Sequence, residues 1–368
     1  MELAHETWLR ESVLASIPCD LPDEDAGHLS SIRRVAPGDR ILDYRIVALI
    51  GRGGFGEVFR AEHELLRRVV AIKVPHDAGA LPALRRSAKI QAALADATIV
   101  RTLEVSLSHD PPYVVFEHVD GPSLAELIRL GGPLPWARAL PLLRDIARAL
   151  RHAHGRGFVH GDVKPANVLV ETRGDRERAR LTDFGNVQDR SAEAGQTAQV
   201  CSSVALDTAR RSEIAGTFPY VAPEVLRGEP ADERADVYGF GVLLFEVLTG
   251  HLPEGRDLPR DLVPGIPLEL DAAFDRCFAR HGRRAPGFDE ILLLLEKAGS
   301  PRSLDPAVER LPTATRRDPA APCVPRRLAA SLWSRLVSWM TSAPSGPERY
   351  EFLEEVLLPS QISALDPK

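Results

Sequence analysis

The sequence predicts a two-lobed α+β fold, in which a small lobe of antiparallel strands with one helix precedes a larger and mainly helical lobe. Three observations predict this fold. Apolar residues alternate with polar ones from Ile41 onward, glycines interrupt that alternation, and beyond Gly121 the apolar spacing changes to three and four residues. A chain of 368 residues has room for one such domain and for further segments at its ends.

The small lobe follows from its alternating segments. Strands are expected over residues 41–50, 57–63 and 67–74, with a glycine-rich turn between the first two. The composition and spacing of residues 83–96 predict a helix. Two more strand-like segments, at residues 99–107 and 112–119, complete this lobe.

Helices dominate the second lobe, where Leu, Ala and Val recur at helical spacing, as in residues 136–157 and 235–250. Beyond residue 300, prolines and arginines recur without periodicity, which is typical of a linker. The expected organisation is an N-terminal extension (1–44), a folded domain (45–300) with lobes at about 45–119 and 120–300, a linker (301–325) and a tail (326–368).

The tail contains an amphipathic segment, residues 326–340. Its apolar side chains are spaced three and four residues apart: Leu328, Leu332, Trp333, Leu336, Trp339 and Met340. This spacing predicts a helix with one apolar face. We expect the helix to dock on the body of the protein or on a partner in preference to a membrane surface, although Trp and Arg also suit an interface.

Composition excludes several classes of protein. The net charge of -6 gives no electrostatic footprint for nucleic acid. No apolar run approaches the eighteen or so residues of a membrane helix, and acidic residues interrupt the N-terminal segment, which argues against a signal peptide. The cysteines lie far apart, without a CxxC pair: Cys19, Cys201, Cys277 and Cys323. We therefore expect a cytoplasmic protein without a transmembrane segment.

A glycine-rich turn and a lysine form the first candidate site. Gly51, Gly53 and Gly56 lie between two predicted strands, where backbone N–H groups can approach phosphate oxygens, although such a hairpin is more often an ordinary turn. The next strand carries Lys73, one of only five lysines in the chain. An ammonium beneath a phosphate-binding loop can neutralise the phosphates of a nucleotide, whereas a solvated strand-edge lysine is the simpler alternative.

The second candidate site interrupts an apolar run, "FVHGDVKPANVLV". Asp162 can accept a proton from a substrate hydroxyl, and Lys164 can hold a transferring phosphoryl group. Asn167 can offer an amide oxygen to Mg²⁺, which prefers oxygen ligands. Downstream, "LTDFGNV" supplies Asp183 as a second metal ligand.

The chain resembles a protein kinase, specifically the eukaryotic-like serine/threonine kinases of bacteria. The resemblance covers about residues 45–298 and includes seven motifs in order: "GRGGFGEV", "VAIK", "PYVVFEHVDGPSL", "HGDVKPANVLV", "DFG", "GTFPYVAPEVL" and "ADVYGFGVLLFEVLTG". It implies the two-lobed protein kinase fold, ATP and Mg²⁺ as cofactors, a protein substrate and transfer of a phosphoryl group to serine or threonine.

The resemblance also assigns residues around the nucleotide. Phe116 corresponds to the gatekeeper, the backbone of the hinge from Glu117 to Val119 would bind adenine, and three side chains would sandwich the ring: Val58, Ala71 and Leu169. Farther along, Glu224 would pair with Arg283 or Arg284, and Asp236 would anchor the catalytic loop.

Two features bear on the substrate class. Lys164 and Thr217 resemble the residues of serine/threonine kinases, because tyrosine kinases usually differ at both places. The "VAPEVL" segment disfavours the small-molecule phosphotransferases, which share the catalytic loop and remain an alternative.

The sequence departs from the family pattern at two places. Gly161 stands where many members have an arginine that binds a phosphorylated activation loop. Ser87 stands where a glutamate should meet Lys73, and Gln91 replaces an apolar residue one turn later. Because of Ser87, a nucleotide-binding pseudokinase that acts as a scaffold or allosteric regulator is the alternative to an active kinase.

Overall fold

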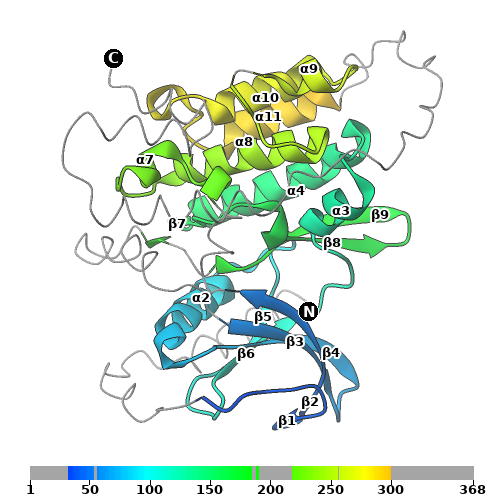
Figure 1. Ribbon diagram of the computed structural model, residues 1–368, viewed down its shortest axis with the longest axis vertical. Helices are drawn as coiled ribbons and strands as arrows, with labels where there is room; N and C mark the ends of the chain where they lie inside the picture. The colour runs from blue at the N-terminus through cyan, green and yellow to red at the C-terminus, as the bar shows by residue number, and fades with distance from the viewer. Residues whose placement is uncertain (1–31, 54–55, 185–187, 190–217, 256, 300–368) are drawn as a thin grey trace, which may run out of the picture.

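A six-stranded antiparallel sheet forms the N-terminal lobe of the computed structural model, which describes residues 32–53, 56–184, 188–189, 218–255 and 257–299 (Figure 1). The strand order is β1-β2-β3-β4-β6-β5. Their bounds are β1 Arg40–Ile41, β2 Tyr44–Gly53, β3 Gly56–His63, β4 Arg68–Val74, β5 Thr102–Ser106 and β6 Tyr113–Glu117. The alternation in the sequence produces this sheet, since successive strand side chains point to opposite faces.

Among the described residues of this lobe, the α-helix is α2 (Leu81–Ala93), which packs on one face of the sheet. Leu84 and Ala88 of α2 join Val105, Val114 and Phe116 of the strands in one buried cluster. The opposite face carries a second cluster of buried strand residues, which include Ile46, Phe59 and Ile72. Both faces of the sheet thus carry buried residues. A shift of β4 by one residue would exchange its two faces, so this burial fixes the register of the strand.

Helices form the C-terminal lobe. They are α3 Leu124–Gly131, α4 Trp136–His154, α7 Pro223–Leu226, α8 Glu233–Thr249, α9 Pro259–Leu262, α10 Leu268–Phe278 and α11 Phe288–Ala298. Four short strands accompany them, β7 Phe158–Val159, β8 Val168–Arg173, β9 Arg176–Leu181 and β10 Gln188–Asp189, paired as β7–β10 and β8–β9. Within the described part of this lobe, 3₁₀ turns lie at Pro165–Asn167, Phe218–Tyr220 and His281–Arg283, and one in the small lobe lies at Ala78–Ala80. The two-lobed α+β architecture predicted from the sequence is confirmed.

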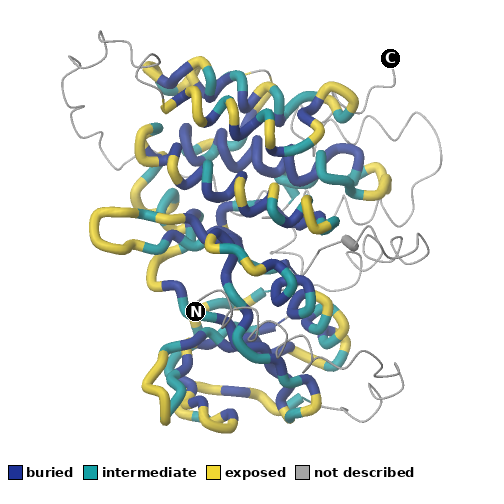
Figure 2. The backbone as a smooth tube through the Cα atoms, turned by 180° about the vertical axis from the view of Figure 1, so that it is seen from behind, coloured by how far each residue is buried: buried dark blue, intermediate teal, exposed yellow. Residues whose placement is uncertain are grey.

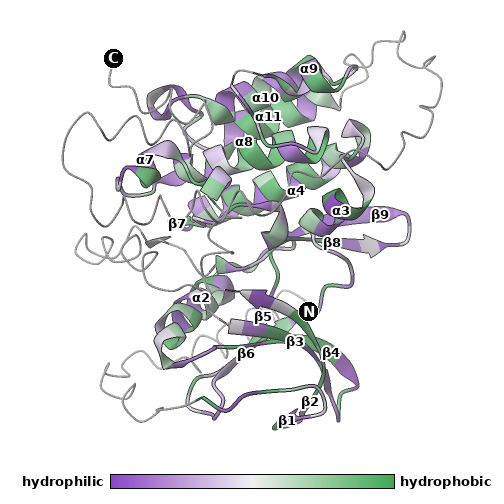
Figure 3. Ribbon diagram, in the orientation of Figure 1, coloured by the Kyte–Doolittle hydropathy of each residue, from purple (hydrophilic) through white to green (hydrophobic). Residues whose placement is uncertain are grey.

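Helix α8 lies at the centre of this lobe. Figure 2 shows α8 largely in the buried colour, and Figure 3 shows it mainly in the hydrophobic colour, as expected for a helix surrounded by protein. A Cβ atom at Gly239 would lie 3.1 Å from the Val163 carbonyl oxygen and 3.2 Å from that of Tyr220. The absence of a side chain there allows the loop around Val163 to lie directly against α8.

Several expectations concern residues outside the described ranges. They are residues 1–31 of the N-terminal extension, the 301–325 linker, the 326–340 helix and Thr217. The expected domain boundaries stay predictions. Within the described residues, no helix has both the length and the apolar character needed to cross a membrane.

Candidate active site

The loop of residues 160–167, which contains the expected catalytic residues, connects β7 to β8 and is anchored by Asp236 of α8. The Asp236 carboxylate accepts hydrogen bonds from the backbone N–H groups of His160 (2.7 Å) and Gly161 (2.8 Å), and its Oδ2 lies 2.8 Å from His154 Nε2. Burial of Asp236 would raise its pKa, but the hydrogen bond and charge of His154, with further help from His160 and the Gly161 N–H, hold the pKa below its ordinary value. Asp236 thus fixes the start of the loop.

Asp162 is buried within this loop, with 8% of its surface exposed. Its Oδ2 accepts hydrogen bonds from Lys164 Nζ at 2.9 Å and from Asn167 Nδ2 at 3.0 Å. Its Oδ1 is buried and has no hydrogen-bond partner among the described residues. Burial raises the pKa of this carboxyl group, although Lys164 acts in the opposite direction. The second oxygen is therefore an acceptor that lacks a donor.

Lys73 and Asp183 form an ion pair between the two lobes. Lys73 Nζ lies 2.8 Å from Asp183 Oδ1, and the lysine is buried. Asp183 has a φ of +64°, a left-handed conformation that is uncommon for residues other than glycine. Burial opposes ionisation of Asp183, yet the charge and hydrogen bond of Lys73 hold its pKa below the ordinary range. The lysine of the small lobe is thus held by an acid of the large lobe.

Asn167 and Asp183 offer oxygen atoms that suit a hard divalent cation. The Asn167 amide nitrogen donates to the Asp162 carbonyl oxygen at 2.8 Å as well as to its carboxylate, so the amide oxygen is the group that can bind a metal. The backbone N–H of Thr182 donates to the Asn167 carbonyl at 3.0 Å, which brings the segment before Asp183 beside Asn167. This donor set fits Mg²⁺.

The glycine-rich hairpin lies at the turn between β2 and β3. Gly51 is paired with Val58 and Gly53 with Gly56. A Cβ atom at Gly56 would lie only 2.3 Å from the Val74 carbonyl oxygen, so a larger residue would separate β3 from β4. The glycine therefore brings the hairpin close to the strand that carries Lys73.

The apolar residues assigned to adenine come together at the junction of the lobes. Phe116 and Val119 are buried in one cluster, and Ala71 of β4 and Leu169 of β8 pack against it. Val58 of β3 is half-buried and lies directly opposite Lys73 in the sheet. Glu117, at the end of β6, borders the same cluster through its neighbour Phe116.

Helix α2 contributes no acid to Lys73, because its sequence "LPALRRSAKIQAA" has none. Ser87 is buried within it. The Gln91 side chain donates instead to the Val100 carbonyl oxygen at 2.6 Å. The C-terminal part of α2 is thus tied to the segment that follows it.

One ion pair and one hydrogen bond join further segments of the large lobe. Arg284, and not Arg283, pairs with Glu224, and both side chains are buried. Tyr220 donates its hydroxyl proton to Glu246. Tyr220 and Glu246 border a pocket of about 240 Å³, and Lys164 also lines this pocket.

Sequence reasoning missed two of these contacts. The Tyr220–Glu246 hydrogen bond joins two of the quoted motifs, but the spacing of the motifs did not identify it. The second contact is made by Arg180 of β9, which pairs with Glu117 and Glu171. The spacing of β9 carried no signal for Arg180, because Arg178 and Arg180 alternate with Ala179 and Leu181 as expected for a strand with one polar face.

Comparison with known proteins places these features in a family. A family model described as a protein kinase domain matches residues 44–261. The chain is 34% identical over 275 residues to serine/threonine-protein kinase pkn2 of Myxococcus xanthus, a match that covers 73% of this chain and 32% of that protein. It is 32% identical over 264 residues to serine/threonine-protein kinase PknB of Mycobacterium leprae, covering 65% of this chain and 40% of that protein.

The chain therefore spans only about a third to two fifths of the length of these curated relatives. Among solved structures, the Mycobacterium tuberculosis PknI kinase domain superposes with a TM-score of 0.54 at 24% identity, covering 72% of this chain and all of that one. That likeness concerns the fold. The family model extends over more than half of the sequence, and the chain belongs to the protein kinase family, among the eukaryotic-like serine/threonine kinases of bacteria.

Proposed function

We propose that the chain is an active serine/threonine protein kinase that transfers the γ-phosphoryl group of ATP to a hydroxyl of a protein substrate. Asp162 would be the base. The observation that carries this proposal is the buried Asp162 Oδ1, which lacks a donor while Oδ2 is held by Lys164 and Asn167. A substrate hydroxyl would supply the missing donor.

The chemistry follows from this arrangement. The serine or threonine oxygen attacks the γ-phosphorus as its proton moves to Asp162, and the bond to the ADP leaving group breaks. The ammonium of Lys164, close to Asp162, is suited to hold the transferring phosphoryl group. The pocket beside Lys164 would receive the peptide segment that carries the hydroxyl.

The nucleotide would be held between the lobes. The glycine-rich hairpin and Lys73 would bind the phosphates, and the hinge from Glu117 to Val119 would bind adenine. Asn167 and Asp183 would hold Mg²⁺, which neutralises phosphate charge when bound. ATP would compete with Asp183 for Lys73, because the two are paired in the structure.

The alternative, a nucleotide-binding pseudokinase, is favoured by one observation, the lack of any acid in α2. We rank it second because that glutamate would act only by positioning Lys73. The residues assigned to phosphate, metal and substrate hydroxyl are all present. The 326–340 helix stays a predicted docking element for a partner or for the kinase body.

The test is transfer of radiolabelled phosphate from ATP to a generic basic protein, followed by identification of the labelled amino acid. The parent should label serine or threonine. The rate of Asp162→Asn should be about 10²–10⁴-fold lower than that of the parent, which is the range for removal of a general base. The variant should still bind nucleotide. Asp183→Asn should also lose transfer. Nucleotide binding by a parent that transfers no phosphate would favour the pseudokinase, and full activity of Asp183→Asn would contradict its assignment.

A further inference from the structure

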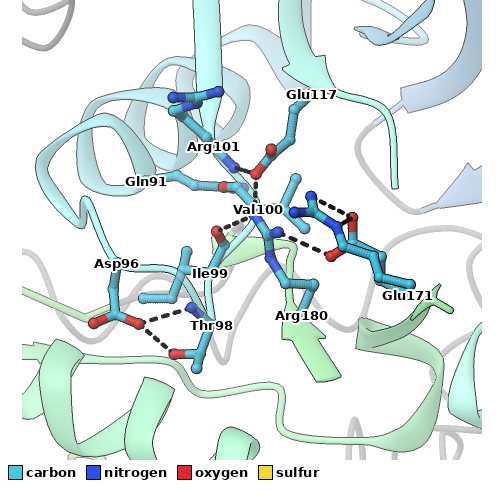
Figure 4. Close-up of polar contacts among 10 residues, drawn as sticks. Gln91, Asp96, Thr98, Ile99, Val100, Arg101, Glu117, Glu171 and Arg180 are labelled. Carbon is cyan, nitrogen blue, oxygen red and sulfur yellow. Dashed lines mark hydrogen bonds and ion pairs between the residues drawn. The ribbon is translucent and has the colours of Figure 1, made fainter. Parts of the chain in front are cut away.

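Arg180 of β9 lies where the hinge, the β8–β9 hairpin and the segment after α2 meet (Figure 4). Its guanidinium pairs with Glu117 of the hinge and, at 3.4 Å, with Glu171 of β8. It also donates to the Ile99 carbonyl oxygen at 3.2 Å. Only 9% of the Arg180 side chain is exposed, so these three contacts are buried. The phosphotransfer chemistry proposed above assigns no role to them.

The position of Arg180 in the hairpin connects it to the expected floor of the adenine site. Arg180 lies directly opposite Leu169 in the β8–β9 ladder. Glu171 follows Leu169 by two residues and therefore lies on the same face of β8. One face of the hairpin thus carries Leu169, the expected floor of the adenine site, and beside it Arg180, which pairs with Glu117 of the hinge.

The hinge residue is held at several points. Glu117 Oε1 accepts hydrogen bonds from Arg180 and, at 2.8 Å, from the backbone N–H of Arg101. The Glu117 backbone N–H in turn donates to the Arg101 carbonyl oxygen at 2.9 Å. These contacts hold the Glu117 side chain and its backbone N–H at the start of the hinge.

The same junction joins the two lobes. The Val100 N–H donates to the Leu181 carbonyl oxygen at 2.9 Å, and the Leu181 N–H donates to the Thr98 carbonyl oxygen at 2.8 Å. Arg180 reaches Ile99 within this segment. The guanidinium therefore stands between the small-lobe hinge and the large-lobe hairpin at the point where the lobes are hydrogen-bonded to each other.

We propose that Arg180 is a positioning residue for nucleotide binding, which sets the spacing between the Glu117 hinge and the Leu169 floor so that adenine fits between them. A planar guanidinium can bind two carboxylates and a carbonyl at once, whereas a lysine offers a single point charge. Removal of the arginine would take the guanidinium away from two half-buried carboxylates and leave Glu117 held only by the backbone of Arg101. The proposal rests on the nucleotide-binding site proposed above.

The experiment measures the Kd of ADP and the KM for ATP and kcat of the full chain, with the melting temperature as a check of folding. Arg180→Met should raise the Kd of ADP and the KM for ATP by about tenfold, the size of one lost charge-assisted contact, and leave kcat within about twofold. The Kd of ADP and the KM for ATP of Arg180→Lys should lie between those of the parent and those of Arg180→Met. The matched control is Arg178→Met, an exposed arginine on the same strand, which should leave all three constants unchanged.

Should Arg180→Met fail to fold, Glu117→Gln tests the same contact from the other side. It should raise the Kd of ADP by about threefold, because a neutral amide accepts a weaker bond from the guanidinium. A folded Arg180 variant with parental ADP affinity, or one that changes kcat alone, would overturn the positioning role. A parent that binds no nucleotide would instead defeat the proposed function, so the two failures are distinguishable.

Discussion

The loop of residues 160–167 and Lys73 are held in different ways. The loop rests on Asp236, a buried carboxylate of the same lobe that accepts two backbone hydrogen bonds from it. Lys73 belongs to the small lobe, and its ion-pair partner Asp183 lies across the site, 110 residues later in the chain. The large-lobe part of the site is therefore assembled by its own core, whereas the position of Lys73 depends on how the lobes meet.

The largest expected effect comes from removal of the anchor below the catalytic loop. Asp236→Ala should lower the free energy of unfolding by about 3–5 kcal/mol, because it leaves buried donors unpaired. Urea unfolding measures this loss. The control is Asp289→Ala, which breaks an exposed ion pair with Arg151 and should cost about 0.5 kcal/mol or less. Equal losses in the two variants would mean that burial of Asp236 does not matter.

The second effect concerns the charge of Asp162. Its pKa is raised by burial, so its ionised form disfavours the folded state, and the stability that its protonated form contributes is lost as pH rises through the folded-state pKa. Asp162→Asn should therefore melt above the parent at pH 7. The difference should shrink as pH falls toward and below the ordinary value of 3.8. A variant that melts below the parent at pH 7 would show that Lys164 outweighs burial.

A smaller effect is expected at α2. Ser87→Glu places a carboxylate in a buried position on the helix, where pairing with Lys73 would add a second restraint on the lysine. We expect phosphotransfer about fivefold faster than in the parent, since better orientation lowers the barrier. Ser87→Gln has nearly the same shape without the charge and should give no gain. Equal rates in the two variants would mean that the new carboxylate does not reach Lys73.

The smallest effect is expected from phosphatase treatment. Residue 161 is glycine, so the side chain that binds a phosphorylated activation loop in many relatives is absent there. The rate of the treated enzyme should stay within about twofold of the untreated one. A drop of about a hundredfold, equivalent to roughly 2.7 kcal/mol, would show that another basic residue has this role.

The features that could be predicted are local ones. Alternation in the small lobe and helical spacing in the large lobe were sufficient for the fold. Asp162, Lys164 and Asn167 lie within six residues of each other, and their contacts follow from one loop. Contacts between distant segments could not be predicted from spacing, because they depend on how the lobes pack.

The pairs between distant residues illustrate this limit. Arg284 and not Arg283 pairs with Glu224, and the 3₁₀ turn at His281–Arg283 decides between them. The sequence pattern does not predict which way each arginine points at the end of this turn. The Arg180–Glu117 contact joins residues 63 positions apart in different lobes. Ser87 could be recognised as a missing acid, but nothing in the sequence identified Asp183 as the partner of Lys73.

The most direct test compares phosphotransfer by the parent and by Lys73→Met at saturating ATP, with ADP affinity measured on both proteins. Lys73 should be used in catalysis although no helix glutamate holds it. We predict that the parent transfers phosphate and that the rate of Lys73→Met is lower by about a hundredfold or more. The melting temperature of the variant should show that it is folded. Parental rates in a folded Lys73→Met variant would contradict a catalytic role for the lysine and for the ion pair that holds it.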